Sequence, residues 1–337
     1  MKRYYAIFCT TFLLSCWTVM DANAQAAKAE AHVAAAKALA YQPGQDLTHV
    51  FEVSCAAPKG TEQPATPRAN ERRIPPRAQW YGEPAKVFDD LYYLGSTNNS
   101  VWAVTTSDGI ILVDANEDYA VEAEVVEGMK KMGLDPKTIK YDVITAAHTS
   151  SYGGAKYLQD HYGTHVLISE ADWNVIAKAT VPPEVKPKKD MVVTDGMKLT
   201  LGDTTLTLYV TPGHTPGTVS IIYPLKDGNQ RHIGAELGGR DPGAEEEGVR
   251  YFPTRADAIR TWEASTKRFQ EIAAKAGADV MISSRGSHDK TPDKLNALKY
   301  RQPGQPHPFV NKDVFHRFTS LVNECNEAQL AWLNTKS

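Results

Sequence analysis

Short runs of β-branched and aromatic residues open the main body of the chain. Between residues 87 and 113 these runs are separated by Gly, Asn and Ser, which predicts an antiparallel meander. Apolar residues at helical spacing then alternate with short apolar runs as far as residue 177, which predicts helices between strands. The expected strands are 87–94, 101–105, 109–113, 141–145 and 165–169, and the expected helices are 119–132, 154–161 and 170–177.

The second half of the body repeats this order. Another group of β-rich runs precedes a long helical pattern, a strand and a shorter helix. A meander followed by helix–strand alternation, twice, predicts two sheets packed face to face with helices outside, an α/β fold with αββα layers. The matching halves favour one domain over residues 86–300. The expected strands here are 191–193, 198–201, 205–210, 219–223, 231–235 and 279–283, and the expected helices are 255–276 and 292–299.

The start of the chain predicts a secretory signal peptide at residues 1–24. Lys2 and Arg3 give a positive start, residues 4–20 are apolar, and an A-x-A cleavage pattern ends at Ala24. The apolar stretch is shorter than a stop-transfer helix requires, so we expect no stable membrane insertion after cleavage. A periplasmic or secreted location follows from this prediction.

Two further segments flank the predicted domain. Residues 25–85 form an N-terminal extension, with an Ala-rich helix expected at residues 25–40. Residues 56–83 contain repeated prolines, which suit neither a helix nor a central strand, so we expect an extended arm. Residues 301–337 are predicted to hold a C-terminal helix that packs on the domain.

The cysteines predict a bridge between the two ends. Cleavage after residue 24 would remove Cys9 and Cys16 and leave only Cys55 and Cys325. In an oxidising compartment such a pair is expected to form a disulfide, which would tie the N-terminal extension to the last helix. Two separate buried thiols remain the alternative, because a count does not prove connectivity.

The charge balance narrows the range of partners. The chain has 37 Lys and Arg against 40 Asp and Glu, a formal charge of −3, and 42% hydrophobic residues, as in an average globular protein. It lacks the basic field that holds nucleic-acid phosphates, so we expect a small-molecule ligand and no nucleic acid. The ten histidines point instead to metal or acid–base chemistry, depending on where they lie.

Three polar loops follow predicted strands, where ligands bind in α/β sheets. They are residues 145–154, 211–218 and 283–289, and they contain His148, His214 and Arg285 respectively. The sequence therefore predicts that ligand-binding residues lie in these three loops.

The same loops carry a resemblance to a known family. Residues 211–218 read TPGHTPGT and resemble the second-histidine loop of the metallo-β-lactamase superfamily. The strand that ends at Asp114 resembles that superfamily's strand-end aspartate, and Gly153-Gly154 after a histidine-bearing loop is also typical of it. The resemblance is strongest to secreted class-B β-lactamase-like or lactonase-like hydrolases. It implies the αββα sandwich of that fold over residues 86–299.

The zinc-binding motif of the family is largely missing. The family's first loop reads H-x-H-x-D-H, and only the second of these four ligand positions keeps its histidine here. By the resemblance, two ligands of the first zinc remain and none of the second, so a dinuclear zinc mechanism is not expected. The corresponding positions are Ala146, His148, Ser150, Ser151, His214 and Arg285.

The surviving groups suggest metal-independent acid–base chemistry on a small anionic or lactone-like molecule. His148, His214 and Tyr152 are the candidate catalytic groups. The candidate substrate-binding residues are Arg285, as an anion anchor, with Ser150, Ser151 and Glu236. No cofactor is expected under this hypothesis.

Alternatives remain open from sequence alone. The protein could be a non-catalytic ligand-binding protein, or a hydrolase with one zinc on His148 and His214, completed by water, Glu236 or His288. Single residues also have alternative roles. Arg285 could pair with a local acid such as Glu236, and Glu236 could be a solvated carboxylate at the pocket rim. Tyr152 could be packed in the core.

Overall fold

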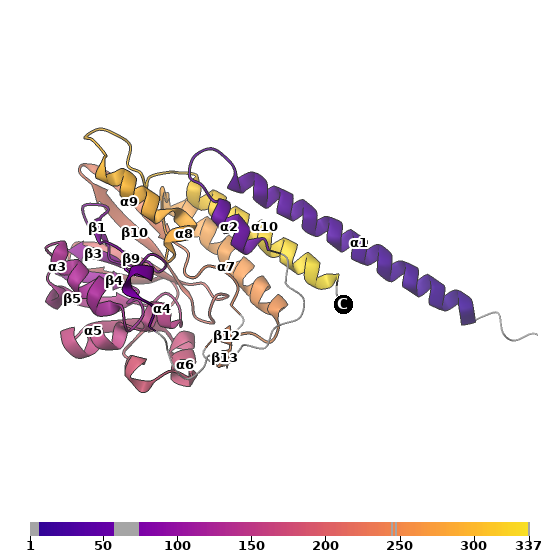
Figure 1. Ribbon diagram of the computed structural model, residues 1–337, viewed down its shortest axis with the longest axis horizontal. Helices are drawn as coiled ribbons and strands as arrows, with labels where there is room; N and C mark the ends of the chain where they lie inside the picture. The colour runs from indigo at the N-terminus through magenta and orange to yellow at the C-terminus, as the bar shows by residue number, and fades with distance from the viewer. Residues whose placement is uncertain (1–6, 57–73, 244, 247, 336–337) are drawn as a thin grey trace, which may run out of the picture.

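The computed structural model describes residues 7–56, 74–243, 245–246 and 248–335, with no side chains described for residues 7–22 and 246. A seven-stranded sheet and a five-stranded sheet face each other, and helices cover the outer face of each (Figure 1). The predicted α/β fold with αββα layers is therefore confirmed. Both sheets bury large side chains, such as Trp102 and Tyr223, in the apolar layer between them. Full burial of such a side chain contributes roughly 1.5–3 kcal/mol.

The seven-stranded sheet has its strands in chain order. It is antiparallel from β1 to β4 and parallel from β4 to β7. Apolar residues of α3, α5 and α6 pack on its outer face. The strands are β1 (Ala85–Lys86), β2 (Leu91–Tyr93), β3 (Trp102–Thr106), β4 (Gly109–Val113), β5 (Ile139–Val143), β6 (His165–Ser169) and β7 (Met191–Val193), and the helices are α3 (Glu127–Lys131), α4 (Thr149–Tyr152), α5 (Ala155–Tyr162) and α6 (Glu170–Lys178).

The five-stranded sheet has the order β14-β11-β10-β9-β8, antiparallel except for the parallel pair β11 and β14. Helices α7 and α10 pack on its outer face through an aromatic-rich cluster. Its strands are β8 (Met197–Leu201), β9 (Thr204–Val210), β10 (Val219–Asp227), β11 (Gln230–Glu236) and β14 (Val280–Ile282). A separate two-stranded sheet consists of β12 (Glu245–Glu246) and β13 (Val249–Arg250). The helices of this half are α7 (Arg255–Ala276), α8 (Gly286–Asp289), α9 (Thr291–Lys299) and α10 (Val314–Asn334).

Local signals explain several of the element boundaries. The expected bounds of β4, β6, β7 and α7 agree with the structure. Helix α7 begins where the Thr254 side chain accepts a hydrogen bond from the Asp257 amide, and it ends at Gly277, whose φ is +76°. These are an N-cap and a left-handed C-cap, which satisfy backbone groups that the helix itself leaves unpaired.

Two expectations for the body were wrong in detail. Strand β7 was expected in the second meander, but it pairs in parallel with β6 in the first sheet. It follows β6 and α6, and a strand–helix–strand crossover returns to the same sheet. The helix expected at 119–132 is instead a π-helical turn at Glu122–Val126 followed by the short α3.

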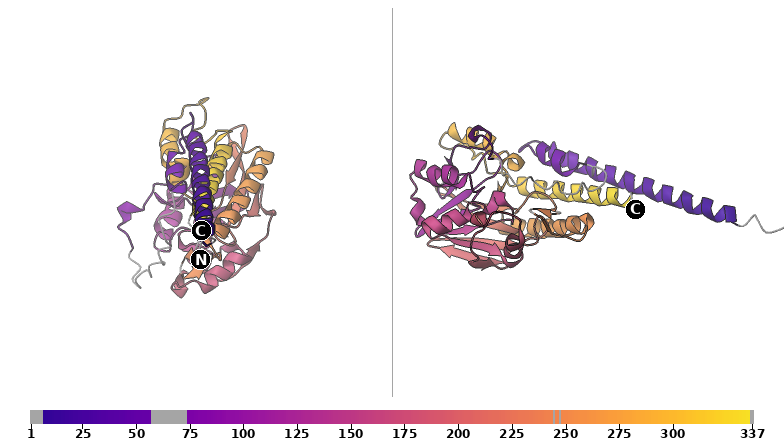
Figure 2. Two further views of the ribbon diagram at one scale, coloured as in Figure 1. Left: turned by 90° about the vertical axis from the view of Figure 1, so that its right-hand side faces the viewer. Right: turned by 60° about the horizontal axis from the view of Figure 1, so that its bottom comes forward.

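The N-terminal extension packs on the C-terminal helix. Helix α1 (Ile7–Ala40), longer than the helix expected at 25–40, runs beside α10 in both views of Figure 2. A second helix, α2 (Thr48–Ser54), had no clear sequence signal. Of the expected proline-rich arm at 56–83, residues 57–73 lie outside the described part, and Arg77–Gln79 forms a 3-10 turn.

A disulfide fixes this packing. Cys55, at the end of α2, is bonded to Cys325 of α10, which confirms the predicted bridge. A cross-link between residues 270 apart stabilises the fold by up to about 5 kcal/mol in the chain-entropy account. Among the described residues, no helix combines the length and apolar character needed to cross a bilayer.

Candidate functional site

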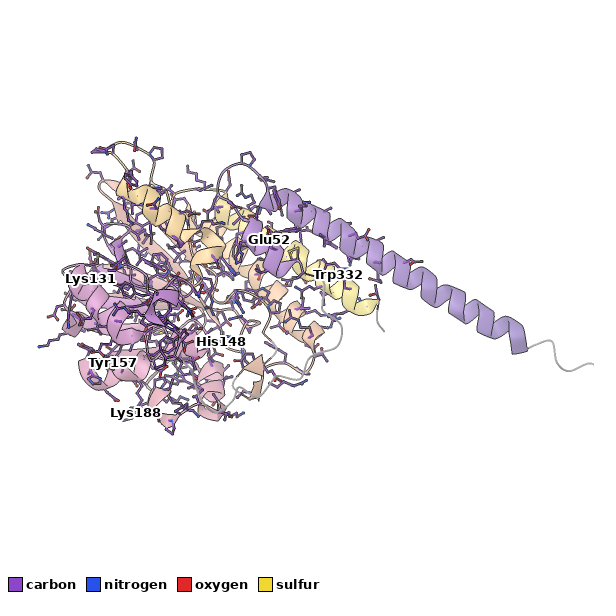
Figure 3. All side chains as sticks on the ribbon, in the orientation of Figure 1. Glu52, Lys131, His148, Tyr157, Lys188 and Trp332 are labelled. Atoms are coloured by element: carbon purple, nitrogen blue, oxygen red, sulfur yellow. A yellow bond between two sulfur atoms is a disulfide. The ribbon has the colours of Figure 1, made fainter. Side chains whose placement is uncertain are left out.

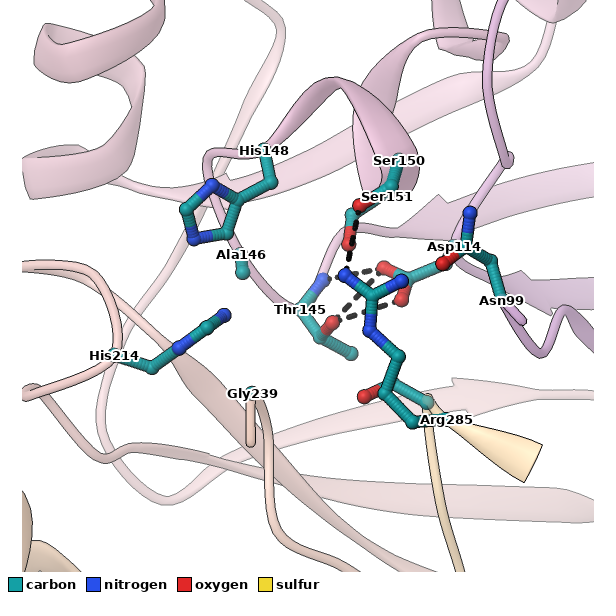
Figure 4. Close-up of a pocket in the computed structure, with 11 residues that line it drawn as sticks. Asn99, Asp114, Thr145, Ala146, His148, Ser150, Ser151, His214, Gly239 and Arg285 are labelled. Carbon is teal, nitrogen blue, oxygen red and sulfur yellow. Dashed lines mark hydrogen bonds between the residues drawn. The ribbon is translucent and has the colours of Figure 1, made fainter. Parts of the chain in front are cut away.

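The three polar loops meet at one edge of the two sheets, as expected. Figure 4 shows the pocket they form, with His148 and His214 on one side and Arg285 on the other. We call the first pair the histidine side and the group Ser150, Ser151 and Arg285 the arginine side. The complete lining is Asn99, Asp114, Thr145, Ala146, His148, Ser150, Ser151, His214, Gly239, Ser284 and Arg285.

The two histidines lie close together. Their ring centroids are 4.6 Å apart, and only 7% of His148 and 6% of His214 is exposed. His214 Nδ1 lies 2.8 Å from the backbone carbonyl of Asp241, which can only accept, so Nδ1 carries the proton and Nε2 holds the lone pair in the neutral ring. This orientation makes Nε2 of His214 a possible proton acceptor.

Asp241 supports His214 in a second way. Its carboxylate Oδ1 is 3.4 Å from the same Nδ1. Burial would raise the pKa of Asp241, but the hydrogen bond and charge of His214, together with Arg240 and Arg255, hold that pKa well below its ordinary value. An ionised carboxylate at this point stabilises an imidazolium on His214, as in other oriented acid–base pairs.

Glycines shape the backbone around His214. Gly239 has φ of +78°, and a Cβ placed on it would lie 2.3 Å from the His214 ring. Gly213 has φ of +137°, and a Cβ there would meet the backbone of Trp262. Only glycine suits both the conformation and the space at these positions, so these two glycines allow the close backbone packing that positions His214.

Arg285 is positioned by its own loop at the end of β14. The Trp102 indole donates a hydrogen bond to the Ser283 carbonyl at 3.1 Å, and the Ser283 hydroxyl bonds to Arg285 backbone groups at 3.0 and 3.1 Å. At its far end, the guanidinium Nη2 donates to Ser150 Oγ at 3.2 Å. The side chain therefore links the loops that follow β14 and β5.

A buried aspartate lies beside this guanidinium. Asp114 directly follows β4 with φ of +64°, and its carboxylate accepts hydrogen bonds of 2.8 to 3.0 Å from the Thr145 amide and hydroxyl. Burial raises the pKa of Asp114 to about 6, although the bonds from Thr145 and Ser151 and the charge of Arg285 favour the ionised form. The acid facing Arg285 is thus Asp114, and not Glu236 as one sequence alternative suggested.

Two candidate residues lie away from the pocket surface. Glu236 was expected near the rim, but it is 0% exposed and accepts a short hydrogen bond from Tyr223. Burial, with the charges of Asp114 and Asp289, raises the pKa of Glu236 to about 8. Tyr152 belongs to the apolar cluster under α4 and α5 and is not among the pocket-lining residues. The burial of Glu236 and Tyr152 outside the pocket lining therefore favours a structural role for both residues.

The donor set does not fit the family's zinc ions. Ala146 offers no donor atom, and the arginine side presents two hydroxyls and a fixed cation. A catalytic zinc takes about three protein ligands, and within the described part of the chain no three His, Cys, Asp or Glu side chains are grouped to hold a metal. Glu236 is buried away from the two imidazoles, and His288 lines a neighbouring cavity. The residues present therefore do not make the family's metal centre.

A wider cleft opens above the pocket. It has a volume of about 440 Å³ and is lined by both histidines, Arg285, and the loop after β11 with Arg240 and Asp241. Sequence reasoning placed the acidic run 245–247 of this loop on the pocket side but gave Arg240 and Asp241 no role, although Gly238-Gly239 directly after a predicted strand was a usable signal of close backbone packing. Asn99, which also lines the cleft, had no comparable signal.

Comparison with known families agrees with this architecture. Residues 94–228 match the model of the metallo-beta-lactamase superfamily. Together with the αββα layers, this match confirms the predicted resemblance to that superfamily. A search of curated proteins found no match.

Solved structures extend the likeness to most of the chain. BJP-1, a subclass B3 metallo-beta-lactamase of Bradyrhizobium japonicum, is 24% identical, with 73% of this chain and 90% of that chain covered and a TM-score of 0.58. FEZ-1 from Legionella gormanii is 22% identical, with coverage of 71% and 91% and a TM-score of 0.60. A Cronobacter sakazakii metallo-beta-lactamase with an HARLDQ motif is 25% identical, with coverage of 74% and 95% and a TM-score of 0.60.

Proposed function

We propose that this protein binds a small carboxylate-bearing molecule through Arg285 and transforms it by acid–base chemistry at His148 and His214. The observation that carries the proposal is the position of the Arg285 guanidinium across one pocket from two adjacent imidazoles. A guanidinium pairs with a carboxylate through two parallel hydrogen bonds, which fixes the ligand's orientation. The imidazoles then face the part of the ligand that projects across the pocket.

The histidine side provides both proton-transfer roles. In hydrolysis of a lactone or ester, Nε2 of His214 takes a proton from the attacking water, and Asp241 stabilises the imidazolium that forms. The water oxygen bonds to the carbonyl carbon, the C–O bond to the leaving oxygen breaks, and that oxygen takes a proton from protonated His148. His214 then returns its proton to the adjacent His148, so both residues regain their starting state and the reaction consumes only water. No step needs a metal ligand that this donor set lacks.

We place this activity in the periplasm or outside the cell. The predicted leader at residues 1–24 and the disulfide between Cys55 and Cys325 support that location, because structural disulfides persist in oxidising compartments.

A binding experiment tests the anchor. Titration with acetate, followed by NMR at the imidazole signals of His148 and His214, should give saturable shifts in the wild type. Arg285→Met should weaken acetate binding at least about tenfold, since it removes a charge-assisted pair. Arg231→Met removes the same charge from an exposed position of β11 and should leave binding unchanged. Equal binding by all three proteins would contradict the proposal.

A kinetic experiment tests the histidines. With mono-4-nitrophenyl succinate as a carboxylate-bearing ester and EDTA present, His214→Ala should lower kcat/KM by about 10² to 10⁴, the usual contribution of a general base. Asp241→Asn should give a smaller loss. Activity that EDTA removes and zinc restores, with zinc bound stoichiometrically to His148 and His214, would instead establish the one-zinc alternative.

A further inference from the structure

A second cavity lies on the other side of Arg285. Its volume is about 490 Å³, which is within the range of small-molecule sites. Helix α2 contributes His49 and Val53 to its lining, and α8 contributes Ser287 and His288. Sequence reasoning did not predict α2 and had assigned residues 25–85 only to an extension, so the α2 wall was unforeseen.

Arg285 stands at the junction of the two cavities. It lines the central pocket, the cleft above the histidines and the cavity against α2. Arg240 and Asp241 also line both of the larger spaces. A carboxylate held at Arg285 therefore has open space in two directions, toward the imidazoles and toward α2.

The charge of the second cavity falls with distance from this junction. The charged residues Arg240, Asp241 and Arg285 lie at the shared end, where the two cations outnumber the one carboxylate. Toward α2 the lining consists of Val53, which is 49% exposed, and the rings of His49 and His288, whose centroids are 6.2 Å apart. Burial lowers the pKa of His288 to about 4, so this ring is neutral at physiological pH. The far end thus suits an uncharged group.

The α2 wall is fastened at several points. Besides the Cys55–Cys325 disulfide, Gln329 Nε2 donates to the Ser54 carbonyl at 2.6 Å. The turn before α2 is held by Gln45 Nε2, which donates to the Asp289 carbonyl at 2.7 Å. These contacts attach one wall of the cavity both to α10 and to α8, the helix that follows Arg285.

We propose that this cavity is a second subsite, which receives the uncharged tail of a carboxylate ligand whose head is held at Arg285, and that the disulfide keeps its α2 wall in place. The proposal rests on the proposed function, since it uses the same anchor. It names the ligand class more closely: a monocarboxylate with an uncharged tail of about four or more carbon atoms.

The experiment compares acetate with hexanoate as probes. Burial of a methylene strengthens binding roughly fourfold, so partial burial of the four extra carbons should make hexanoate bind at least about tenfold more tightly than acetate. Val53→Asn, similar in size but polar, should lower this ratio to about threefold. Glu52→Asn changes the neighbouring position of α2, an exposed residue that does not line the cavity (Figure 3), and should leave the ratio unchanged.

The outcomes separate the two proposals. A ratio near one, with acetate binding still dependent on Arg285, would overturn the second subsite and leave the anchor standing. A tenfold ratio that Val53→Asn does not reduce would likewise overturn it. If acetate binding does not depend on Arg285, both proposals fail.

The disulfide is tested in the same assay. The double variant Cys55→Ser and Cys325→Ser should lose most of the hexanoate advantage while acetate binding and circular dichroism stay near wild type. An unchanged ratio would show that the bridge does not hold the wall. If the double variant does not fold, mild reduction of the folded wild-type protein replaces it, with the same expected result.

Discussion

The two sides of the pocket are built on different supports. On the histidine side, backbone groups and glycines hold the rings, and Asp241 lies at the surface beside His214. On the arginine side, a fixed cation lies over a buried carboxylate, Asp114, which interacts electrostatically with two more acids, Asp142 and Glu236. The histidine side therefore presents two adjacent imidazoles, whereas the arginine side presents a permanent charge beside buried acids whose pKa values are raised.

This difference suggests what the arginine replaces. By the family resemblance, Arg285 stands where a ligand of the second metal would be. A guanidinium beside Asp114 offsets negative charge as a cation would, but it supplies no Lewis acidity. The buried acid at the end of β4 is thus retained next to a cation.

The largest expected effect is on the pH dependence of the free energy of unfolding, and it concerns the buried acids near Arg285. The pKa of Glu236 is raised from 4.5 to about 8 in the folded protein, so the folded state holds a proton that the unfolded chain loses above pH 4.5. The stabilisation is complete below pH 4.5 and is lost as the pH rises through 8, a change on the order of 4 kcal/mol. Glu236→Gln keeps a partner for Tyr223 and should flatten this slope in urea unfolding measured from pH 4.5 to 8.5.

The matching control is a surface carboxylate. Glu127, exposed and paired with Lys130 at 2.7 Å, should leave the slope unchanged when replaced by Gln. If the free energy of unfolding of Glu236→Gln depends on pH as that of the wild type does, Glu236 is not the group that titrates. The two sides of the pocket would then differ less in their buried acids than we infer.

A smaller effect is expected from adding one ligand to the histidine side. Ala146 lines the pocket close to His148 (Figure 4), and Ala146→His would bring a third imidazole to the pair. Three ligands complete a usual catalytic zinc set, so zinc affinity should rise on the order of a hundredfold. Competition with a chelating dye measures this gain.

The corresponding change on the arginine side provides the comparison. Arg285→His adds an imidazole next to serine hydroxyls and should give no such increase in zinc affinity. Equal gains from the two variants would remove the distinction between the sides as far as metal binding is concerned.

The smallest expected effect is a change in the free energy of unfolding when a fully buried acid, Asp142, is replaced. Asp142 of β5 is fully buried, and within the described part of the chain neither carboxylate oxygen has a hydrogen-bond partner. Burial, with the nearby charge of Asp114, raises the pKa of Asp142 well above its ordinary value. Asp142→Val replaces a poorly satisfied polar group with a strand-favouring apolar one and should raise the free energy of unfolding by about 2 kcal/mol. A loss of stability would show that this carboxyl has a supporting role.

Sequence reasoning succeeded where local patterns decide the structure. The alternating runs predicted both sheets, strand ends predicted three ligand-binding loops, and the family resemblance implied that His148, His214 and Arg285 share a pocket. Strand β7 was misassigned because its partner depends on a crossover rather than on its own residues. Local sequence does not report burial either, so Glu236 was expected at the rim although it lies beneath the site.

The supporting residues were harder to predict than the candidate catalytic ones. Asp241 contacts His214 only because Gly239 lets two loops approach closely, and that approach is a property of the assembled fold. Tyr152 follows His148 by four residues but packs in the apolar cluster. His148 is the N-cap residue with extended backbone, so the helical spacing that would place the two side chains on one face does not apply. Helix α2 is short and gains its position from the disulfide rather than from helical propensity.

The span of the disulfide also sets an order of assembly. Cys325 comes later in the chain than every residue that lines the three cavities, including those of α2, which are made among the first. The segment that includes α2 therefore cannot be cross-linked until Cys325 has been synthesised. All residues that line the three cavities precede that point, so the cavity against α2 gains its covalent support only when the two ends of the chain are joined.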